Sequence, residues 1–214
     1  MSHGTISQEW MRTYEDAFLK DVHQLLLWGY EDATSKITAD SQEEEITGWI
    51  VDAINDRLDG NIDDRFQHYI VEDSPPVRHS QQTGKRRKKL DIVFNSTSVR
   101  PAPQLHCEAK RLRSPGFTIG DYVGSDGLGC FTNAQYAAEH HMGAMVGYIQ
   151  SQGPDYWIGE LQRRLDDDKE GVLRCLEGLS DCQVLQNLSN EKTSRHTRVG
   201  RDDILIYHIF LSDS

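Results

Sequence analysis

Two short apolar segments carry the residues whose types and spacing could do chemistry. Asp91 lies in the run KKLDIVF, and Glu108 and Lys110 lie two residues apart in the run LHCEAK. Both runs have the composition of β-strands, and residues two apart on a strand share a face. We therefore expect Glu108 and Lys110 to point the same way, with Asp91 brought beside them when the two strands pair.

Two carboxylates held this close repel each other unless a cation lies between them. Hard oxygen ligands of this kind suit Mg²⁺ or Mn²⁺. Lys110 on the same face would then contact the attacking water or the phosphate, while the metal activates the nucleophile. Asp91, Glu108 and Lys110 are thus the minimum set for metal-dependent cleavage of a phosphodiester, and we expect them to be the catalytic residues.

The elements before and around these residues follow from hydrophobic periodicity. Apolar residues recur at three- and four-residue steps over residues 6–33, which predicts a helix,. A second helix is expected to open at Ser41 as its N-cap and to end at Gly60. Residues 66–71 fit either a short strand or a last helical turn. Leu90–Phe94 and Leu105–Leu112 are expected to form an antiparallel hairpin.

The second half of the chain alternates between helical and strand patterns. The glycine-rich residues 114–130 are typical of a mobile loop, which either closes over a substrate or is a flexible connection,. After it, the sequence predicts a helix at Phe131–His141, a strand at Met145–Gln150, helices at Tyr156–Leu165 and Gly171–Leu179, and a strand at Ile204–Leu211. This order predicts an α/β domain over residues 41–214, a mixed sheet flanked by helices, behind an N-terminal helical segment of residues 1–40.

The aspartate, a gap of sixteen residues and then ExK resemble the PD-(D/E)XK nuclease superfamily over roughly residues 41–150. The resemblance implies a restriction-endonuclease-like core, with Mg²⁺ or Mn²⁺ held by Asp91 and Glu108 and with Lys110 positioning the water. The backbone carbonyl of Ala109 is a further ligand that it implies. The proline that names the motif is replaced here by Leu90, a departure that many members share.

The same resemblance implies another catalytic, metal-binding glutamate on the helix that precedes the core strands. This helix begins EEEITGWIVDAI. Glu43 fits best, because apolar residues follow it three, six and seven positions later. Glu44 and Glu45 remain alternatives.

The charge is unevenly distributed along the chain. A formal net charge of −11 argues against a protein that coats nucleic acid nonspecifically, but it allows a local basic groove,. The second group of cations, Arg195, Arg198 and Arg201, fits either the far wall of such a groove or a charged turn. The first group of cations lies next to the candidate centre and consists of Lys85, Arg86, Arg87, Lys88 and Lys89. We expect it to form either phosphate contacts or a solvated loop, and Arg111 and Arg113 would extend the phosphate contacts.

The remaining composition narrows the class of protein. The four cysteines form no CxxC pair, so we expect free thiols and no structural zinc,. No run has the length of a membrane span and the N-terminus has no secretion signal, so we expect a cytoplasmic protein without membrane contact.

The sequence therefore predicts a magnesium-dependent (endo)deoxyribonuclease. DNA is the expected substrate, and RNA is the alternative. Since no DNA-reading domain is recognisable, specificity would come from loops, from a homodimer or from a protein partner, as in an effector of restriction or antiviral defence. The alternative function is a non-catalytic nucleic-acid-binding or protein-interaction module on the same fold.

Overall fold

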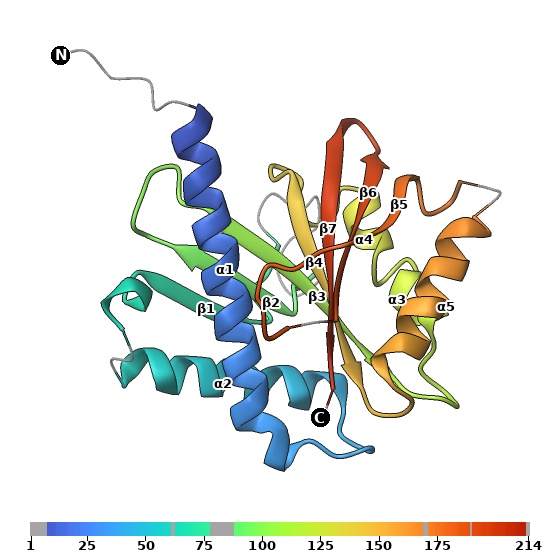
Figure 1. The fold of residues 1–214 in the computed structure, drawn as a ribbon, viewed down its shortest axis with the longest axis horizontal. Helices are drawn as coiled ribbons and strands as arrows, with labels where there is room; N and C mark the ends of the chain where they lie inside the picture. The colour runs from blue at the N-terminus through green and yellow to red at the C-terminus, as the bar shows by residue number, and fades with distance from the viewer. Residues whose placement is uncertain (1–7, 61–62, 78–87, 169–170, 189, 213–214) are drawn as a thin grey trace.

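A computed structural model describes residues 8–60, 63–77, 88–168, 171–188 and 190–212 of the chain. Within these residues, seven strands form one mixed sheet in the order β1-β2-β3-β4-β7-β6-β5, with helices on both faces (Figure 1). The α/β fold with a mixed sheet, as predicted, is confirmed.

The helices and strands have the following bounds. The helices are α1 (Gln8–Ala33), α2 (Glu43–Asp59), α3 (Ile119–Val123), α4 (Gly129–Thr132) and α5 (Pro154–Asp166), with single 3₁₀ turns η1 (Thr34–Lys36) and η2 (Asp64–Phe66). The strands are β1 (Tyr69–Asp73), β2 (Ile92–Ser96), β3 (Gln104–Leu112), β4 (Met142–Ile149), β5 (Cys175–Asp181), β6 (Glu191–Arg198) and β7 (Arg201–Leu211). The ambiguous residues 66–71 thus contain the end of η2 and the start of β1.

The sheet is antiparallel at both edges and parallel in the middle. β1, β2 and β3 pair antiparallel, β4 pairs parallel with both β3 and β7, and β6 pairs antiparallel with β5 and β7. A parallel strand covered on both faces needs apolar residues throughout, and MGAMVGYI of β4 is buried except for its last residue,. The antiparallel β2–β3 hairpin predicted from the sequence is confirmed.

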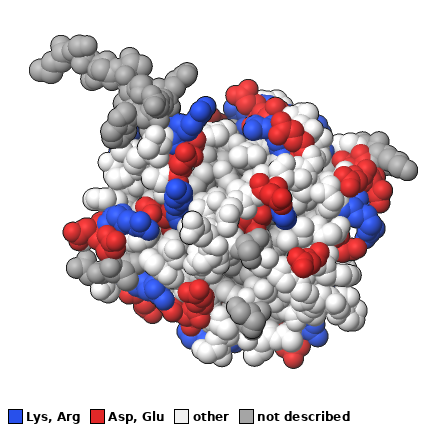
Figure 2. Space-filling view, viewed as in Figure 1, with Lys and Arg blue, Asp and Glu red and all other residues white. Residues whose placement is uncertain are grey.

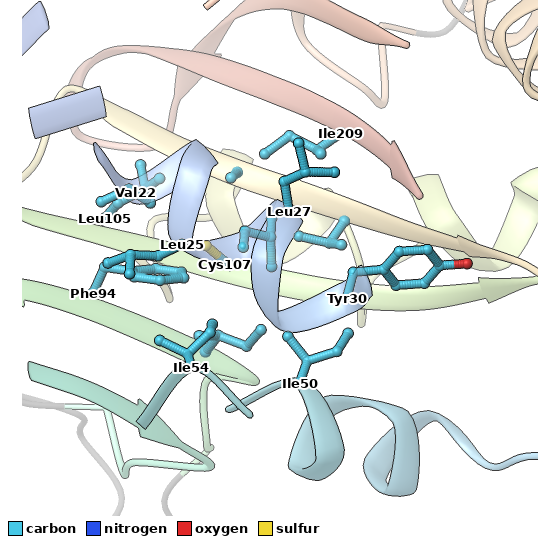
Figure 3. Packing of buried hydrophobic residues seen from close by; sticks show 14 of the residues in the cluster. Val22, Leu25, Leu27, Tyr30, Ile50, Ile54, Phe94, Leu105, Cys107 and Ile209 are labelled. Carbon is cyan, nitrogen blue, oxygen red and sulfur yellow. The ribbon is translucent and has the colours of Figure 1, made fainter. Parts of the chain in front are cut away.

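The helices α1 and α2 cover one face of the sheet (Figure 1). Figure 3 shows Val22 and Leu25 of α1 packed with Phe94 of β2 and Leu105 of β3. Helix α1 therefore shares one hydrophobic core with the strands. The chain contributes to this core on both sides of the boundary expected at residue 40. On the other face, α3, α4 and α5 pack over β4 and β7.

Two of the predicted helices are wrong. Helix α4 ends at Thr132, and Phe131–His141 is otherwise a series of turns in which Ala134 and Ala137 have φ of +52° and +50°. Left-handed residues cannot continue a right-handed helix. In place of the helix predicted at Gly171–Leu179, the chain forms edge strand β5.

The expectation of a mobile loop over residues 114–130 is also wrong. This segment folds into α3 and the start of α4, and the side chains of Tyr122 and Leu128 are fully buried. The Tyr122 hydroxyl donates a hydrogen bond to Met145 O at 3.2 Å. The segment is therefore a packed part of the second core. Within the described residues, no helix is long and apolar enough to cross a membrane.

Candidate active site

The register of the β2–β3 hairpin brings Asp91 next to Glu108. Ile92 pairs with Cys107, so Asp91 lies beside β3 where the pairing with β2 stops. The Asp91 carboxylate accepts a hydrogen bond of 2.6 Å from the backbone N–H of Ala109. The carboxylate thus takes the place of a strand carbonyl at the first unpaired position of the β3 edge.

Glu43 reaches the same edge from the first turn of α2. Its Oε2 accepts a hydrogen bond of 3.0 Å from the backbone N–H of Arg111, and its Oε1 accepts one of 3.0 Å from Lys110 Nζ. Glu44 and Glu45 are exposed, and the Glu45 carboxylate instead accepts from the N–H of Gln42 at the start of α2. Of the three candidate glutamates, the structure brings Glu43 to the site.

The N-cap of α2 lies one residue later than expected. The chain enters the helix at Gln42, whereas the Ser41 hydroxyl accepts from the N–H of Thr38. The Ser41 side chain therefore closes the preceding turn, and the prediction of Ser41 as the cap is wrong.

Lys110 lies at the centre of the cluster. Its ammonium donates to Glu108 Oε1 at 2.7 Å, to Ala109 O at 2.8 Å and to Glu43 Oε1 at 3.0 Å. The Lys110 side chain is 14% exposed. Three oxygens from two elements therefore converge on one cation in a largely buried position.

The cluster holds more carboxylates than cations, and the proton affinities reflect this. Burial and then the charge of Asp91 raise the pKa of Glu108 to about 8, against the opposing effect of Lys110. Burial also raises the pKa of Asp91, against the hydrogen bond from Ala109. Burial disfavours the Lys110 ammonium, but the charges of Glu108 and Glu43 outweigh it and raise the pKa of Lys110. Additional positive charge would therefore stabilise this site.

The oxygens of the cluster have the chemistry that a divalent cation requires. Glu108 Oε2 is buried and has no hydrogen-bond partner within the described part of the chain, and the carbonyl of Ala109 already points at the Lys110 ammonium. These are hard ligands of the kind that Mg²⁺ and Mn²⁺ prefer. Nevertheless, no group of three or more His, Cys, Asp or Glu within the described ranges is arranged to hold a metal ion. The donor types fit a metal, but side chains would have to move to bind it.

The basic run before Asp91 lies only partly within the described residues. Lys85, Arg86 and Arg87 are outside them. Lys88 Nζ lies 2.9 Å from a carboxylate oxygen of Asp126, and Lys89 is exposed. The expectation of phosphate contact at this run remains a prediction.

The two arginines that follow Lys110 are used within the protein. The guanidinium of Arg111 donates to Ser41 O at 2.8 Å and lies 3.8 Å from the ring centroid of Phe117. Arg113 donates to Ala39 O at 2.7 Å and to the Asp40 carboxylate at 3.0 Å. Because Arg111 is buried, the structure gives no support to a phosphate contact there, whereas Arg113 remains partly exposed.

The second group of cations, Arg195, Arg198 and Arg201, does not line one side of a groove together. Arg195 faces Glu177 at 3.5 Å, and buried Arg198 donates to Ala137 O at 2.7 Å. Arg201 pairs with Glu139 at 3.2 Å and lines a groove beside the candidate site. On the face drawn in Figure 2, acidic and basic side chains are interspersed rather than gathered into one basic area.

Sequence reasoning missed that groove, which has a volume of about 740 Å³. Asn95 on β2 and Gln104 on β3 line it. A signal for both was present, because positions 91, 93 and 95 share one face of a strand, as do 104, 106 and 108. Asn133 and Gln135 also line the groove, but the helix predicted there hid their position.

We compared the chain with protein-family models, with curated proteins and with solved structures, and none of the three comparisons found a match.

Proposed function

We propose that this chain is a Mg²⁺- or Mn²⁺-dependent nuclease of the PD-(D/E)XK type that hydrolyses phosphodiester bonds of DNA. The observation that carries the proposal is the convergence of Asp91, Glu108, Lys110 and Glu43 at the unpaired edge of β3. Helix α2, the β2–β3 hairpin and parallel strand β4 also follow one another in the order of a restriction-endonuclease-like core.

Each residue has a distinct part in this reaction. Asp91, Glu108 and the carbonyl of Ala109 would hold the divalent cation. When bound, this cation would act as a Lewis acid and lower the pKa of water. Lys110 would donate to the attacking water or to a phosphate oxygen. Glu43 would hold the Lys110 ammonium in position, since it contacts both Lys110 and the N–H of Arg111.

The test is cleavage of supercoiled and linear DNA with and without Mg²⁺ or Mn²⁺, comparing wild type with Lys110→Ala and Asp91→Ala. Lys192→Ala is the matched control, because Lys192 lies on β6 and pairs with Asp181 at the far edge of the sheet. We expect metal-dependent cutting that falls at least about 100-fold in both site variants and is unchanged in the control. Cutting that survives both site substitutions would contradict the assignment.

A non-catalytic nucleic-acid-binding or protein-interaction module is the second candidate. It is favoured by one observation, namely that Asp91 and Glu43 already accept hydrogen bonds from the β3 backbone, as purely structural carboxylates would. Such a module would bind DNA or RNA without metal and would tolerate Lys110→Ala. For either function, we expect the protein to act in the cytoplasm. We also expect a homodimer or a protein partner to supply recognition of the nucleic acid, in restriction or antiviral defence.

A further inference from the structure

The groove beside the candidate site, here called the amide groove, is lined by side chains that the proposed hydrolysis does not use. Its defining residues are Asn95, Gln104, His106, Asn133, Gln135 and His140. Its volume of about 740 Å³ lies within the range of roughly 300–1,000 Å³ that is usual for sites of small organic ligands,.

The strands that line the amide groove, β2 and β3, also lead to the carboxylate cluster. Asn95 pairs with Gln104 across β2 and β3, and Val93 pairs with His106 next to them. Because side chains alternate along a strand, this face leads to Asp91 on one strand and to Glu108 on the other. A ligand in the groove would therefore lie beside a phosphate held at the cluster.

The charge of the groove does not suit a phosphate backbone. Its lining includes two acidic residues, Glu72 and Glu139, and two basic residues, Lys88 and Arg201. Both cations already have acidic partners, since Lys88 pairs with Asp126 and Arg201 pairs with Glu139. The groove is thus balanced in charge, and neutral polar groups distinguish it.

The side-chain amides among these groups are accessible, because Asn133 and Gln135 are exposed and Asn95 and Gln104 are partly exposed. The side-chain amides of Asn95, Gln104, Asn133 and Gln135 have no hydrogen-bond partner among the described residues. Asparagine and glutamine present a donor and an acceptor together, which matches the paired donors and acceptors on the edge of a base. The rings of His106 and His140 also line the groove, packed edge to face with their centroids 4.9 Å apart.

We propose that the amide groove binds an unpaired nucleobase whose neighbouring phosphate lies at the cluster of Asp91, Glu108 and Lys110. The inference rests on the proposed function in that this phosphate is the one to be cleaved. A base within a duplex has its pairing edge occupied and its faces stacked. The substrate is therefore a single strand, or a duplex with a flipped or unpaired nucleotide beside the scissile bond.

The test measures binding without cleavage. Two labelled short single strands, identical except that one lacks the central base, are titrated with protein in EDTA, and a free nucleoside is titrated in parallel. The base preference is the Kd for the abasic strand divided by the Kd for the intact strand. It is measured for wild type, for Asn95→Ala combined with Gln104→Ala, for Gln135→Ala, and for Gln186→Ala, an exposed amide on the connection that follows β5.

We expect a wild-type base preference of about ten-fold, equivalent to about 1.4 kcal/mol, within the range for one well-contacted base. It should fall several-fold in both groove variants and remain in Gln186→Ala. Gln135 lies in a turn, so its variant decides the result if the strand double variant fails to fold. Weak binding of the free nucleoside that competes with the intact strand would further support the groove.

A wild-type base preference near one would overturn the proposal, as would a preference that both groove variants retain. These outcomes are separate from those for the nuclease. Base preference in a protein that never cuts DNA would support the proposed base site and contradict the proposed nuclease. Cutting without base preference would support the nuclease and contradict the base site.

Discussion

Glu43 contacts two groups at once, the Lys110 ammonium and the backbone N–H of Arg111. Its first contact bears on the proposed reaction and its second on the edge of β3. Glu43→Gln separates the two, because the amide keeps an oxygen for the N–H of Arg111 but loses the charge that holds Lys110.

We expect Glu43→Gln to lower kcat by about 10–100-fold at saturating metal, as for loss of a supporting contact at a metal site, with little change in folding. Glu44→Gln is the control, because Glu44 is the exposed neighbour in the same helical turn. The measurement is the cleavage rate together with the midpoint of thermal unfolding. Equal rates for the two variants would contradict the role given to Glu43.

A second buried carboxylate, Glu191 on β6, faces His23 of α1. His23 Nδ1 lies 2.7 Å from Leu19 O and must donate to it, so the other ring nitrogen of neutral His23 is an acceptor. That nitrogen lies 3.4 Å from Glu191 Oε1. Burial lowers the pKa of His23 to about 4. Burial also raises the pKa of Glu191 to about 7, against hydrogen bonds from Val184 and Leu185. A protonated Glu191 is therefore the form that suits this pocket.

This arrangement predicts a pH-dependent stability. Because the folded pKa of Glu191 lies above its ordinary value of 4.5, its stabilising contribution is complete below that value and is lost as the pH rises through about 7,. Glu191→Gln stays neutral and keeps an oxygen for the Val184 N–H. We expect it to be more stable than wild type at about pH 8 by up to about 3 kcal/mol, and similar at about pH 4.

Urea unfolding across this pH range checks the prediction, with Glu191→Leu as the control that removes the backbone contacts at every pH. A Glu191→Gln variant that parallels wild type at all pH values would contradict the assignment of Glu191 as the titrating group.

At the scale of elements, α1 and α2 approach each other closely at Gly29. A Cβ added there would lie 2.5 Å from Ile54 Cγ1 and 2.8 Å from Ile50 O. Neither the isoleucine branch nor a helix carbonyl can move far without disturbing the core that covers β2 and β3. The absence of a side chain at Gly29 thus sets how α2, and with it Glu43, sits on the sheet.

We expect Gly29→Ala to destabilise the fold by about 1–3 kcal/mol, the usual cost of overpacking. Gly48→Ala in α2 is the matched control, because a Cβ there would meet nothing within 4 Å. It should be neutral or stabilise by up to about 1 kcal/mol through helix propensity. Denaturant midpoints of the two variants give the comparison, and a tolerated Gly29→Ala would mean that the helices can separate freely.

Across the whole molecule, the sequence predicted best where strand periodicity alone decides geometry. Asp91, Glu108 and Lys110 could be placed on one face because side chains alternate along each strand. Glu43 could be preferred from the apolar positions that follow it, but Glu44 and Glu45 stayed open, since the choice depends on where α2 begins and on how it lies on β3.

Strand β6 was invisible to hydropathy for a different reason. Its sequence is EKTSRHTR, and its inward face includes Ser194 and His196. These are buried through hydrogen bonds, with Ser194 Oγ 2.6 Å from His196 Nε2 and 2.7 Å from His208 Nε2. A polar network that is satisfied only in three dimensions leaves no apolar pattern to read. The left-handed Ala134 and Ala137 that break the predicted helix likewise depend on tertiary contacts, including the bond from Arg198 to Ala137 O.

The carboxylates along β3 have a consequence for self-association. A strand edge with free N–H groups is a template for adding another chain, and natural proteins protect such edges with charge. Asp91 and Glu43 occupy the N–H groups of Ala109 and Arg111 where β2 no longer covers them. Removing either carboxylate would therefore expose a template for aggregation as well as disable the proposed chemistry. Asp91→Asn or Glu43→Gln would lower the proposed activity while keeping an oxygen that accepts from these N–H groups.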